Sequence, residues 1–214
     1  MTRRVIAVTV MLALYALSAA LGAFSLPTYR NASGVDDLGH LVIPSLLLMV
    51  GKETAQYIFW LGTLPLELFF VGITLVVLFT GKGIRLGICL YVAYFLHWVF
   101  LHLTTLPPPD HSVWQFPEGV FTLSKPYPND FWFSGHTANA VLIALATAGS
   151  RPWLKGLAWG NVFFEILIVL STRTHYTIDV GGGIFVAYTI HRASLDVAAS
   201  LARSSGRLPA GPPP

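Results

Sequence analysis

The sequence predicts an all-α protein that crosses a membrane about six times. Of its 214 residues, 54% are hydrophobic and 11% are charged. A soluble domain carries about 25% charged residues, so most of this chain must face lipid or other apolar helices. Its apolar runs are each long enough to cross, or nearly cross, a ~30 Å hydrocarbon layer as a helix. They fall at about residues 5–25, 54–80, 84–106, 134–150, 153–172 and 176–195.

The N-terminal part raises two questions of assignment. The first run follows Arg3 and Arg4 and ends near small residues, which is also the pattern of a cleaved signal peptide. We expect a retained span. Residues 38–51 form a shorter apolar stretch that contains Pro44, so we expect an interfacial or re-entrant helix there and leave a short span open.

The rest of the chain is expected to belong to one domain. The stretch 107–133 is the longest polar segment, and its many prolines predict an ordered cap outside the membrane rather than a helix. We expect a single transmembrane catalytic domain over 1–200 and a flexible tail over 201–214. The only cysteine, Cys89, excludes an internal disulfide and a thiolate metal cluster.

Basic residues predict the orientation. With six spans both termini lie on one side, together with nine of the 13 lysines and arginines, and the positive-inside rule makes that side cytoplasmic. The stretch 107–133 and the turn at 172–175 then face outward. We therefore expect an integral protein of the cell (inner) membrane with an extracytoplasmic site. The net charge of +3 is too small to indicate nucleic-acid binding. The nine lysines and arginines that we place on the cytoplasmic side are Arg3, Arg4, Lys82, Arg85, Arg151, Lys155, Arg192, Arg203 and Arg207.

The first motif that can carry chemistry is Ser134-Gly135-His136-Thr137, at the entry to the fourth predicted span. Serine is a good N-cap, and the first turn of a helix offers unpaired N–H groups and a positive dipole end to an anion. A glycine beside the cap lets a ligand approach the backbone closely. These residues are therefore candidates for contact with a phosphate.

The second motif is His175-Tyr176-Thr177-Ile178-Asp179, at the start of the sixth predicted span. A spacing of four places His175 and Asp179 on one helical face. The carboxylate can then accept one imidazole N–H and leave the other ring nitrogen free to attack an electrophile. Ionisable groups at membrane depth are costly and are functional candidates by default.

Three other interpretations remain open from the residues alone. Two histidines and an aspartate could hold zinc, although a third nitrogen or sulfur ligand at close spacing is missing. The histidines could simply be satisfied within a helical bundle. They could also belong to a proton relay, but the groups gather at one membrane face rather than across it.

The motifs resemble the type 2 phosphatidic acid phosphatase superfamily of histidine phosphotransferases, and within it the sphingomyelin synthase-like branch. The resemblance rests on residues 104–107 (TTLP), 130–137 (DFWFSGHT) and 175–180 (HYTIDV). It covers about residues 84–195. The phosphatase branch has an arginine six residues before its second histidine, where this chain has Val169. The synthase branch lacks that arginine, as this chain does, but tends to carry an arginine in the third span, where His97 stands here.

The resemblance implies roles for three residues: His175 as the nucleophile, Asp179 as its orienting group and His136 as general acid and base. It implies transfer of a phosphoalcohol headgroup from a glycerophospholipid to a lipid hydroxyl, such as that of ceramide or diacylglycerol. Hydrolysis by a phospholipase C or lipid phosphatase would use the same residues. A transporter or a non-catalytic lipid-binding relative is the alternative outside enzymes. No cofactor or metal is expected, and a homo-oligomer stays open.

Further candidates for substrate binding surround the motifs. Arg173 and Lys125 could hold a phosphodiester and stabilise its transition state. Asp130 could bind a cationic headgroup or only stabilise the following helix start. His97 and His102 diverge by about 140° around their helix, so at most one faces the site, and we favour His102 because it is nearer the outer end.

Overall fold

The computed structural model describes residues 3–23, 37–104, 106–113, 115–120, 122 and 132–205. Every regular element in these ranges is a helix, which confirms the predicted all-α class. Each predicted apolar run forms one helix. These helices are α1 (Arg3–Ala23), α4 (Lys52–Thr80), α5 (Ile84–Leu103), α6 (Gly135–Ala146), α7 (Pro152–Ser171) and α8 (Thr177–Ser204).

Four of these helices, α1, α4, α5 and α7, are long and apolar enough to cross a membrane. Helix α6 has 12 residues and is therefore only about 18 Å long. Helix α8 has 28 residues, but its sequence is less apolar. The protein is thus a polytopic membrane protein, and the number of six spans stays a prediction. Helix α8 also runs to Ser204, beyond residue 200, where we placed the end of the catalytic domain. Of the predicted tail, residues 206–214 lie outside the described residues.

Residues 38–51 form two short helices, α2 (Leu38–Val42) and α3 (Leu46–Val50). Proline disfavours helical backbone in the residue before it, and Ile43 is accordingly extended, with φ −98° and ψ 117°. Five residues of helix rise only about 7.5 Å, so neither helix alone can span a bilayer. Several of their apolar side chains, including Leu41 and Leu48, are exposed.

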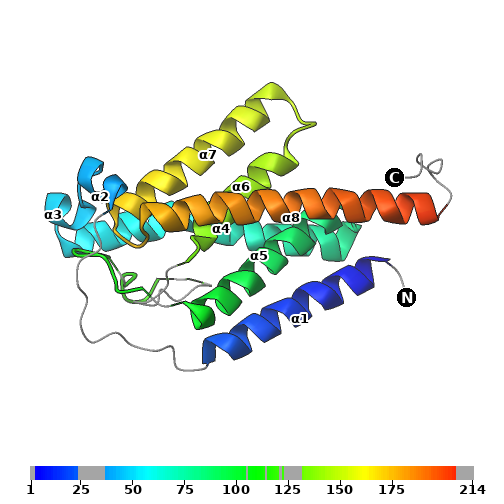
Figure 1. Cartoon of the computed structure of the whole chain (residues 1–214), viewed down its shortest axis with the longest axis horizontal. Helices are drawn as coiled ribbons and strands as arrows, with labels where there is room; N and C mark the ends of the chain where they lie inside the picture. The colour runs from blue at the N-terminus through cyan, green and yellow to red at the C-terminus, as the bar shows by residue number, and fades with distance from the viewer. Residues whose placement is uncertain are drawn as a thin grey trace.

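Helix α8 packs along α6, and two of its glycines make this contact possible (Figure 1). A Cβ atom on Gly183 would lie 2.7 Å from the Ser134 carbonyl oxygen and 3.2 Å from the Ala138 nitrogen. One on Gly182 would lie 3.1 Å from the Phe133 Cβ. Small residues allow such close helix approach in membrane proteins. The main core lies between α5, α6 and their neighbours, and it includes Cys89.

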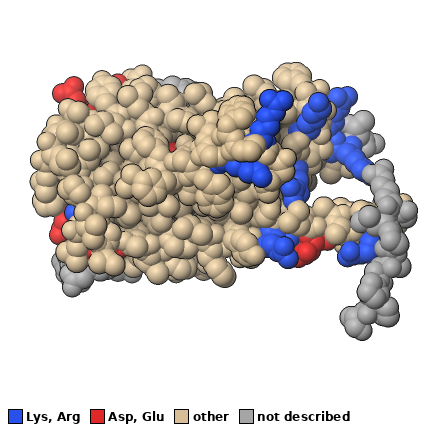
Figure 2. Space-filling model, turned by 90° about the horizontal axis from the view of Figure 1, so that it is seen from above, with Lys and Arg blue, Asp and Glu red and all other residues tan. Residues whose placement is uncertain are grey.

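The two ends of the bundle differ in charge. Both termini lie at one end, and α2, α3 and the start of α8 lie at the other (Figure 1). On the face that Figure 2 shows, lysine and arginine side chains gather toward the end with the termini. This is the charge asymmetry from which the orientation was predicted. The extracytoplasmic position of the opposite end stays a prediction.

Candidate active site

The second motif lies in the turn between α7 and α8 and in the first turn of α8. His175 and Asp179 are 4% and 0% exposed, and His175 Nδ1 lies 3.6 Å from Asp179 Oδ2. The same carboxylate oxygen accepts a hydrogen bond of 2.9 Å from the Tyr176 N–H, so Asp179 also caps α8. Nδ1 is thus the ring nitrogen that faces the carboxylate, and Nε2 lies on the other edge of the ring.

Asp179 also connects the two motifs. Its Oδ1 accepts a hydrogen bond of 3.2 Å from the Trp132 N–H. Its backbone carbonyl accepts one of 2.9 Å from the Ser134 N–H. The structure therefore brings together two segments that are distant in the sequence, and it places the N-terminal ends of α6 and α8 side by side. Two positive dipole ends at one place favour an anionic ligand.

The first motif forms the start of α6, with Ser134 as its N-cap. The Ser134 Oγ accepts hydrogen bonds from the Thr137 N–H at 3.3 Å and from the Thr137 hydroxyl at 3.0 Å. Both side chains are fully buried, so the structure gives them a capping role. His136 is only half-buried in the first turn of α6, and its ring centroid lies 6.3 Å from that of Phe59 on α4.

Helix α5 contacts the first motif through His97. His97 Nδ1 donates a hydrogen bond of 2.9 Å to the Phe133 carbonyl, and the His97 ring also lies within 4 Å of the site of a Cβ on Gly135. His102 instead donates from Nδ1 to the Trp98 carbonyl of its own helix, at 2.8 Å. His97 is thus the residue of this pair that contacts the segment before α6, although we preferred His102 as the one that faces the site. A substrate contact by His102 stays a prediction.

Asp37, just before α2, and His40 within α2 form hydrogen bonds with the second motif. Asp37 accepts hydrogen bonds from the Thr177 N–H at 2.8 Å, the Thr177 hydroxyl at 2.7 Å and the His40 N–H at 3.0 Å. It thus caps α2 and binds the first residue of α8. His40 Nε2 donates to the His175 carbonyl at 2.9 Å. We assigned Asp37 and His40 no role from the sequence, although an aspartate before an apolar stretch is an N-cap signal.

Arg173 completes this group of contacts, which we call the α2 clamp: Asp37, His40, Arg173 and Thr177. Arg173 has a positive φ of 58°, and its Nη2 donates to the His40 carbonyl at 2.8 Å. Its Nε is buried and has no hydrogen-bond partner among the described residues. The guanidinium is therefore tied to the clamp through one nitrogen, and its predicted contact with phosphate stays untested.

The pKa values of Asp37 and His40 are both lowered within the α2 clamp. Burial is the largest influence on Asp37 and acts to raise its pKa, but the hydrogen bonds from Thr177 and His40 prevail and lower it. Burial, with a smaller effect of the Arg173 charge, lowers the pKa of His40. His40 is therefore neutral at neutral pH. Since a carbonyl can only accept, its proton lies on Nε2 and faces His175.

Other candidates contribute less. Lys125 and Asp130 lie outside the described residues. Glu67 accepts a hydrogen bond of 2.9 Å from the Thr122 hydroxyl. Glu165 is fully buried within α7, and neither carboxyl oxygen has a hydrogen-bond partner in the described part of the chain. Within those residues no three His, Cys, Asp or Glu side chains are grouped as a metal site requires.

Comparison with known proteins supports the resemblance that the motifs predicted. Residues 129–195, which contain both motifs, match the family described as PAP2 superfamily C-terminal. The phosphatidylinositol:ceramide inositolphosphotransferase 3 of Arabidopsis thaliana is 29% identical over 117 residues. The alignment covers 50% of this chain and 38% of the relative, so the chain spans less than half of the length of the curated relative. No solved structure gives a significant match. The predicted resemblance to a phosphotransferase branch of the PAP2 superfamily is confirmed.

Proposed function

We propose that this chain is a membrane lipid phosphotransferase that moves a phosphoalcohol headgroup from a glycerophospholipid to a lipid hydroxyl. The single observation that carries the proposal is the contact between the motifs. Asp179 lies beside His175 and accepts backbone hydrogen bonds from Trp132 and Ser134, on either side of Phe133 and just before His136. An orienting carboxylate, a buried imidazole and a second imidazole thus share one end of the bundle. A relative whose name denotes an inositolphosphotransferase acting on ceramide supports the same reaction class.

In the first half-reaction, His175 Nε2 attacks phosphorus of the donor phosphodiester. The bond from phosphorus to the diacylglycerol oxygen breaks, and the headgroup phosphate is then bonded to His175 as a phosphohistidine. His136 donates a proton to the departing oxygen, which leaves as a neutral alcohol. The Asp179 carboxylate faces Nδ1 and stabilises the positive charge that develops on the ring.

In the second half-reaction, His136 takes the proton of an incoming lipid hydroxyl. The oxygen attacks phosphorus, the bond to His175 Nε2 breaks, and the headgroup is transferred without net change in protons. General acid–base catalysis of this kind contributes about 10²–10⁴-fold. The N-terminal ends of α6 and α8 can stabilise charge on the phosphoryl oxygens in both steps. With water as the acceptor the same residues would perform hydrolysis, which is the reaction expected of phosphatase members of the superfamily.

The experiment that tests this function is incubation of the purified protein, in detergent micelles, with phospholipid labelled in the headgroup. Ceramide, diacylglycerol or no acceptor is added, and the lipids are then separated. Label in a new lipid that depends on the acceptor supports transfer. Release of water-soluble label without any dependence on acceptor would assign the chain to the hydrolases. Absence of both products, with lipid still bound, would favour a non-catalytic lipid-binding protein.

A further inference from the structure

The chain that joins α5 to α6 is attached to residues that precede and follow His175. We call the described part of this connection the connecting loop, and it comprises residues 106–113, 115–120 and 122. The Tyr176 hydroxyl donates a hydrogen bond of 2.9 Å to the Pro107 carbonyl. The Val113 N–H donates one of 2.8 Å to the Thr172 carbonyl, in the turn that leads to His175. The connecting loop therefore contacts the second motif and the turn before it.

The connecting loop also packs on the side of the site that carries His136. Its Phe116 ring stacks on the Phe59 ring of α4, with centroids 5.0 Å apart. Phe59 is 2% exposed, and its ring centroid lies 6.3 Å from that of His136. Val113 is 3% exposed and packs in the same hydrophobic cluster as Phe59 and Phe116. We call Phe59, Val113 and Phe116 the loop cluster.

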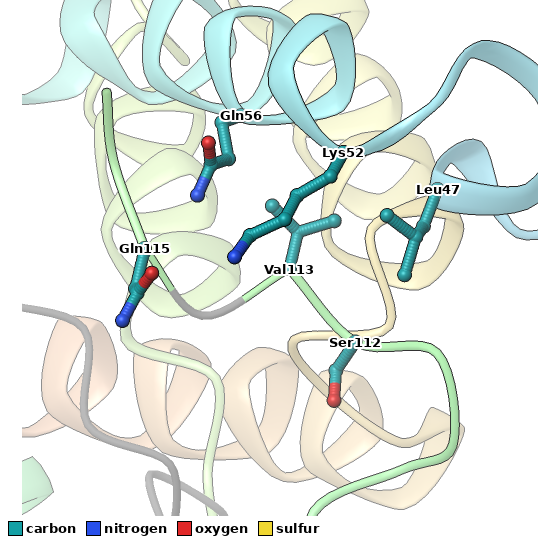
Figure 3. Close-up of a pocket in the computed structure, with 6 residues that line it drawn as sticks. All are labelled: Leu47, Lys52, Gln56, Ser112, Val113 and Gln115. Atoms are coloured by element: carbon teal, nitrogen blue, oxygen red, sulfur yellow. The ribbon is translucent and has the colours of Figure 1, made fainter. Parts of the chain in front are cut away.

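A polar cavity of about 290 Å³ lies next to the loop cluster, between α3, the start of α4 and the connecting loop. Because a molecule of liquid water occupies about 30 Å³, this cavity can hold several waters. Val113 lines the cavity and packs with Phe59, whose ring is near His136. The loop cluster thus lies between the cavity and the His136 ring. Figure 3 shows three polar side chains that reach into the cavity, namely Lys52, Gln56 and Gln115.

Both ends of the connecting loop are restrained. Three consecutive prolines at positions 107–109 fix the backbone φ at about −65° and limit the conformations of its start. At the other end, the Thr122 hydroxyl donates to Glu67 Oε1 at 2.9 Å. Glu67 is 8% exposed and lies near the middle of the 29-residue helix α4. Part of the stretch that we expected as an outer cap therefore reaches into the helical bundle.

We propose that the connecting loop shields the phosphohistidine from water, so that Phe116 and Thr122 determine whether a lipid hydroxyl or water accepts the headgroup. The inference rests on the proposed function and concerns the acceptor in its second half-reaction. In hydrolysis, a water oxygen bonds to phosphorus, one water proton passes to His136, and the bond to His175 Nε2 breaks. A site that excludes water protects a reactive intermediate from this reaction. An acceptor lipid arrives from the bilayer and need not cross the loop cluster.

The test measures how one label divides between two products of a single reaction. Full-length protein in detergent micelles receives ceramide and either phosphatidylinositol or phosphatidylcholine labelled in the headgroup. Label in the new lipid is divided by label released to water. Phe116→Ala should lower this ratio by about 3–10-fold, the effect of one aromatic pair. Thr122→Val should lower it by about 2–10-fold, because valine cannot donate to Glu67. Both products arise from the same enzyme molecules, so the ratio does not depend on the amount of folded protein.

Ethanol provides a second measurement. If water gains access to the phosphohistidine in these variants, added ethanol should gain it too and form an ethyl ester of the headgroup phosphate. A loss of stability alone would not create this product. Tyr15→Ala is the matched control, because it removes another stacked aromatic pair, between Tyr15 of α1 and Tyr94 of α5, whose ring centroids are 6.1 Å apart. Its product ratio and its yield of ethyl ester should equal those of the wild type.

Three outcomes decide between the inference and its alternatives. An unchanged ratio in both Phe116→Ala and Thr122→Val would overturn the inference and leave the proposed function intact. An equal fall of the ratio in Tyr15→Ala would assign the effect to general loosening of the bundle and would also overturn it. If the wild-type protein forms no acceptor-dependent lipid from either donor, the proposed function itself fails, and this inference fails with it.

Discussion

The two histidines of the candidate site differ in burial and in their contacts with the described residues. His175 is 4% exposed, its Nδ1 faces Asp179, and its carbonyl accepts from His40. His136 is half-buried in the first turn of α6 and packs near Phe59. A nucleophile needs one fixed direction of attack, whereas a proton-transfer group must serve a departing and an incoming alcohol in succession. The difference therefore agrees with the proposed roles.

The largest expected effect separates these roles. His175→Ala should abolish both half-reactions, because no atom remains to bond to phosphorus. His136→Ala should slow transfer from a natural lipid by about 10²–10⁴-fold, because an alkoxide leaves poorly without a proton. A nitrophenyl phosphodiester, whose leaving group needs little protonation, should partly rescue His136→Ala and not His175→Ala. Rates of product formation with the two substrates measure the rescue. Equal rescue of both variants would mean that the nucleophile is assigned to the wrong residue.

Asp179→Asn tests whether the Asp179 carboxylate orients the His175 ring. The amide oxygen can still accept one backbone hydrogen bond, but it no longer stabilises a charged imidazole. We expect kcat to fall by about 10–100-fold, the range found when a group that orients a metal-bound histidine is removed. Thermal unfolding should show a loss of about 0.5–2 kcal/mol, because Asp179 also caps α8. Wild-type kcat in a destabilised Asp179→Asn protein would show that the carboxylate is only a cap.

Gly183→Ala tests whether the two histidines must be held at a fixed separation. The added Cβ would approach the Ser134 carbonyl to 2.7 Å and push α6 away from α8. Overpacking of this kind costs about 1–3 kcal/mol, and we expect lower activity along with lower thermal stability. Gly181→Ala is the matched control, since nothing lies within 4 Å of its Cβ position. If both variants behave alike, the close contact at Gly183 does not position the motifs.

The α2 clamp provides a test of His175 that spares the catalytic groups. His40→Leu removes the hydrogen bond to the His175 carbonyl and should lower kcat by about tenfold with KM unchanged, since one bond of this kind is worth about 0.5–1.5 kcal/mol. His40→Gln can donate from its side-chain amide and should recover most of the rate. A rise in KM, or no difference between the leucine and glutamine variants, would exclude a positioning role. Thermal unfolding of both variants controls for general damage.

The smallest expected effect is a dependence of stability on pH. Folding lowers the pKa of His40 below its ordinary 6.5, so the unfolded chain binds more protons in that range. Thermal stability should therefore fall as pH is lowered from about 6.5 toward the folded pKa. Burial lowers that pKa most and the Arg173 charge lowers it further, whereas the hydrogen bond to the His175 carbonyl and the charges of Asp37 and Asp179 raise it. The fall should be smaller in His40→Gln. An identical pH profile in both proteins would assign the titration to other groups.

Local sequence patterns determined the helices and the position of the chemistry. Apolar runs of sufficient length predicted each long helix to within a few residues at most ends, because helix formation in an apolar medium depends on composition and length. Residues 38–51, where we expected one interfacial or re-entrant helix, form two short helices on either side of Pro44. Spacing alone paired His175 with Asp179, since residues four apart share a helical face.

Contacts between distant segments were decided only by the tertiary structure. Whether His97 or His102 faces Phe133 depends on the rotation of α5 about its axis, which packing against α6 sets. The α2 clamp joins Asp37 to Thr177 and His40 to His175, and no local pattern encodes such a pairing. An N-cap signal at Asp37 shows that the carboxylate will accept backbone hydrogen bonds, but only the packed chain brings a second helix start within its reach.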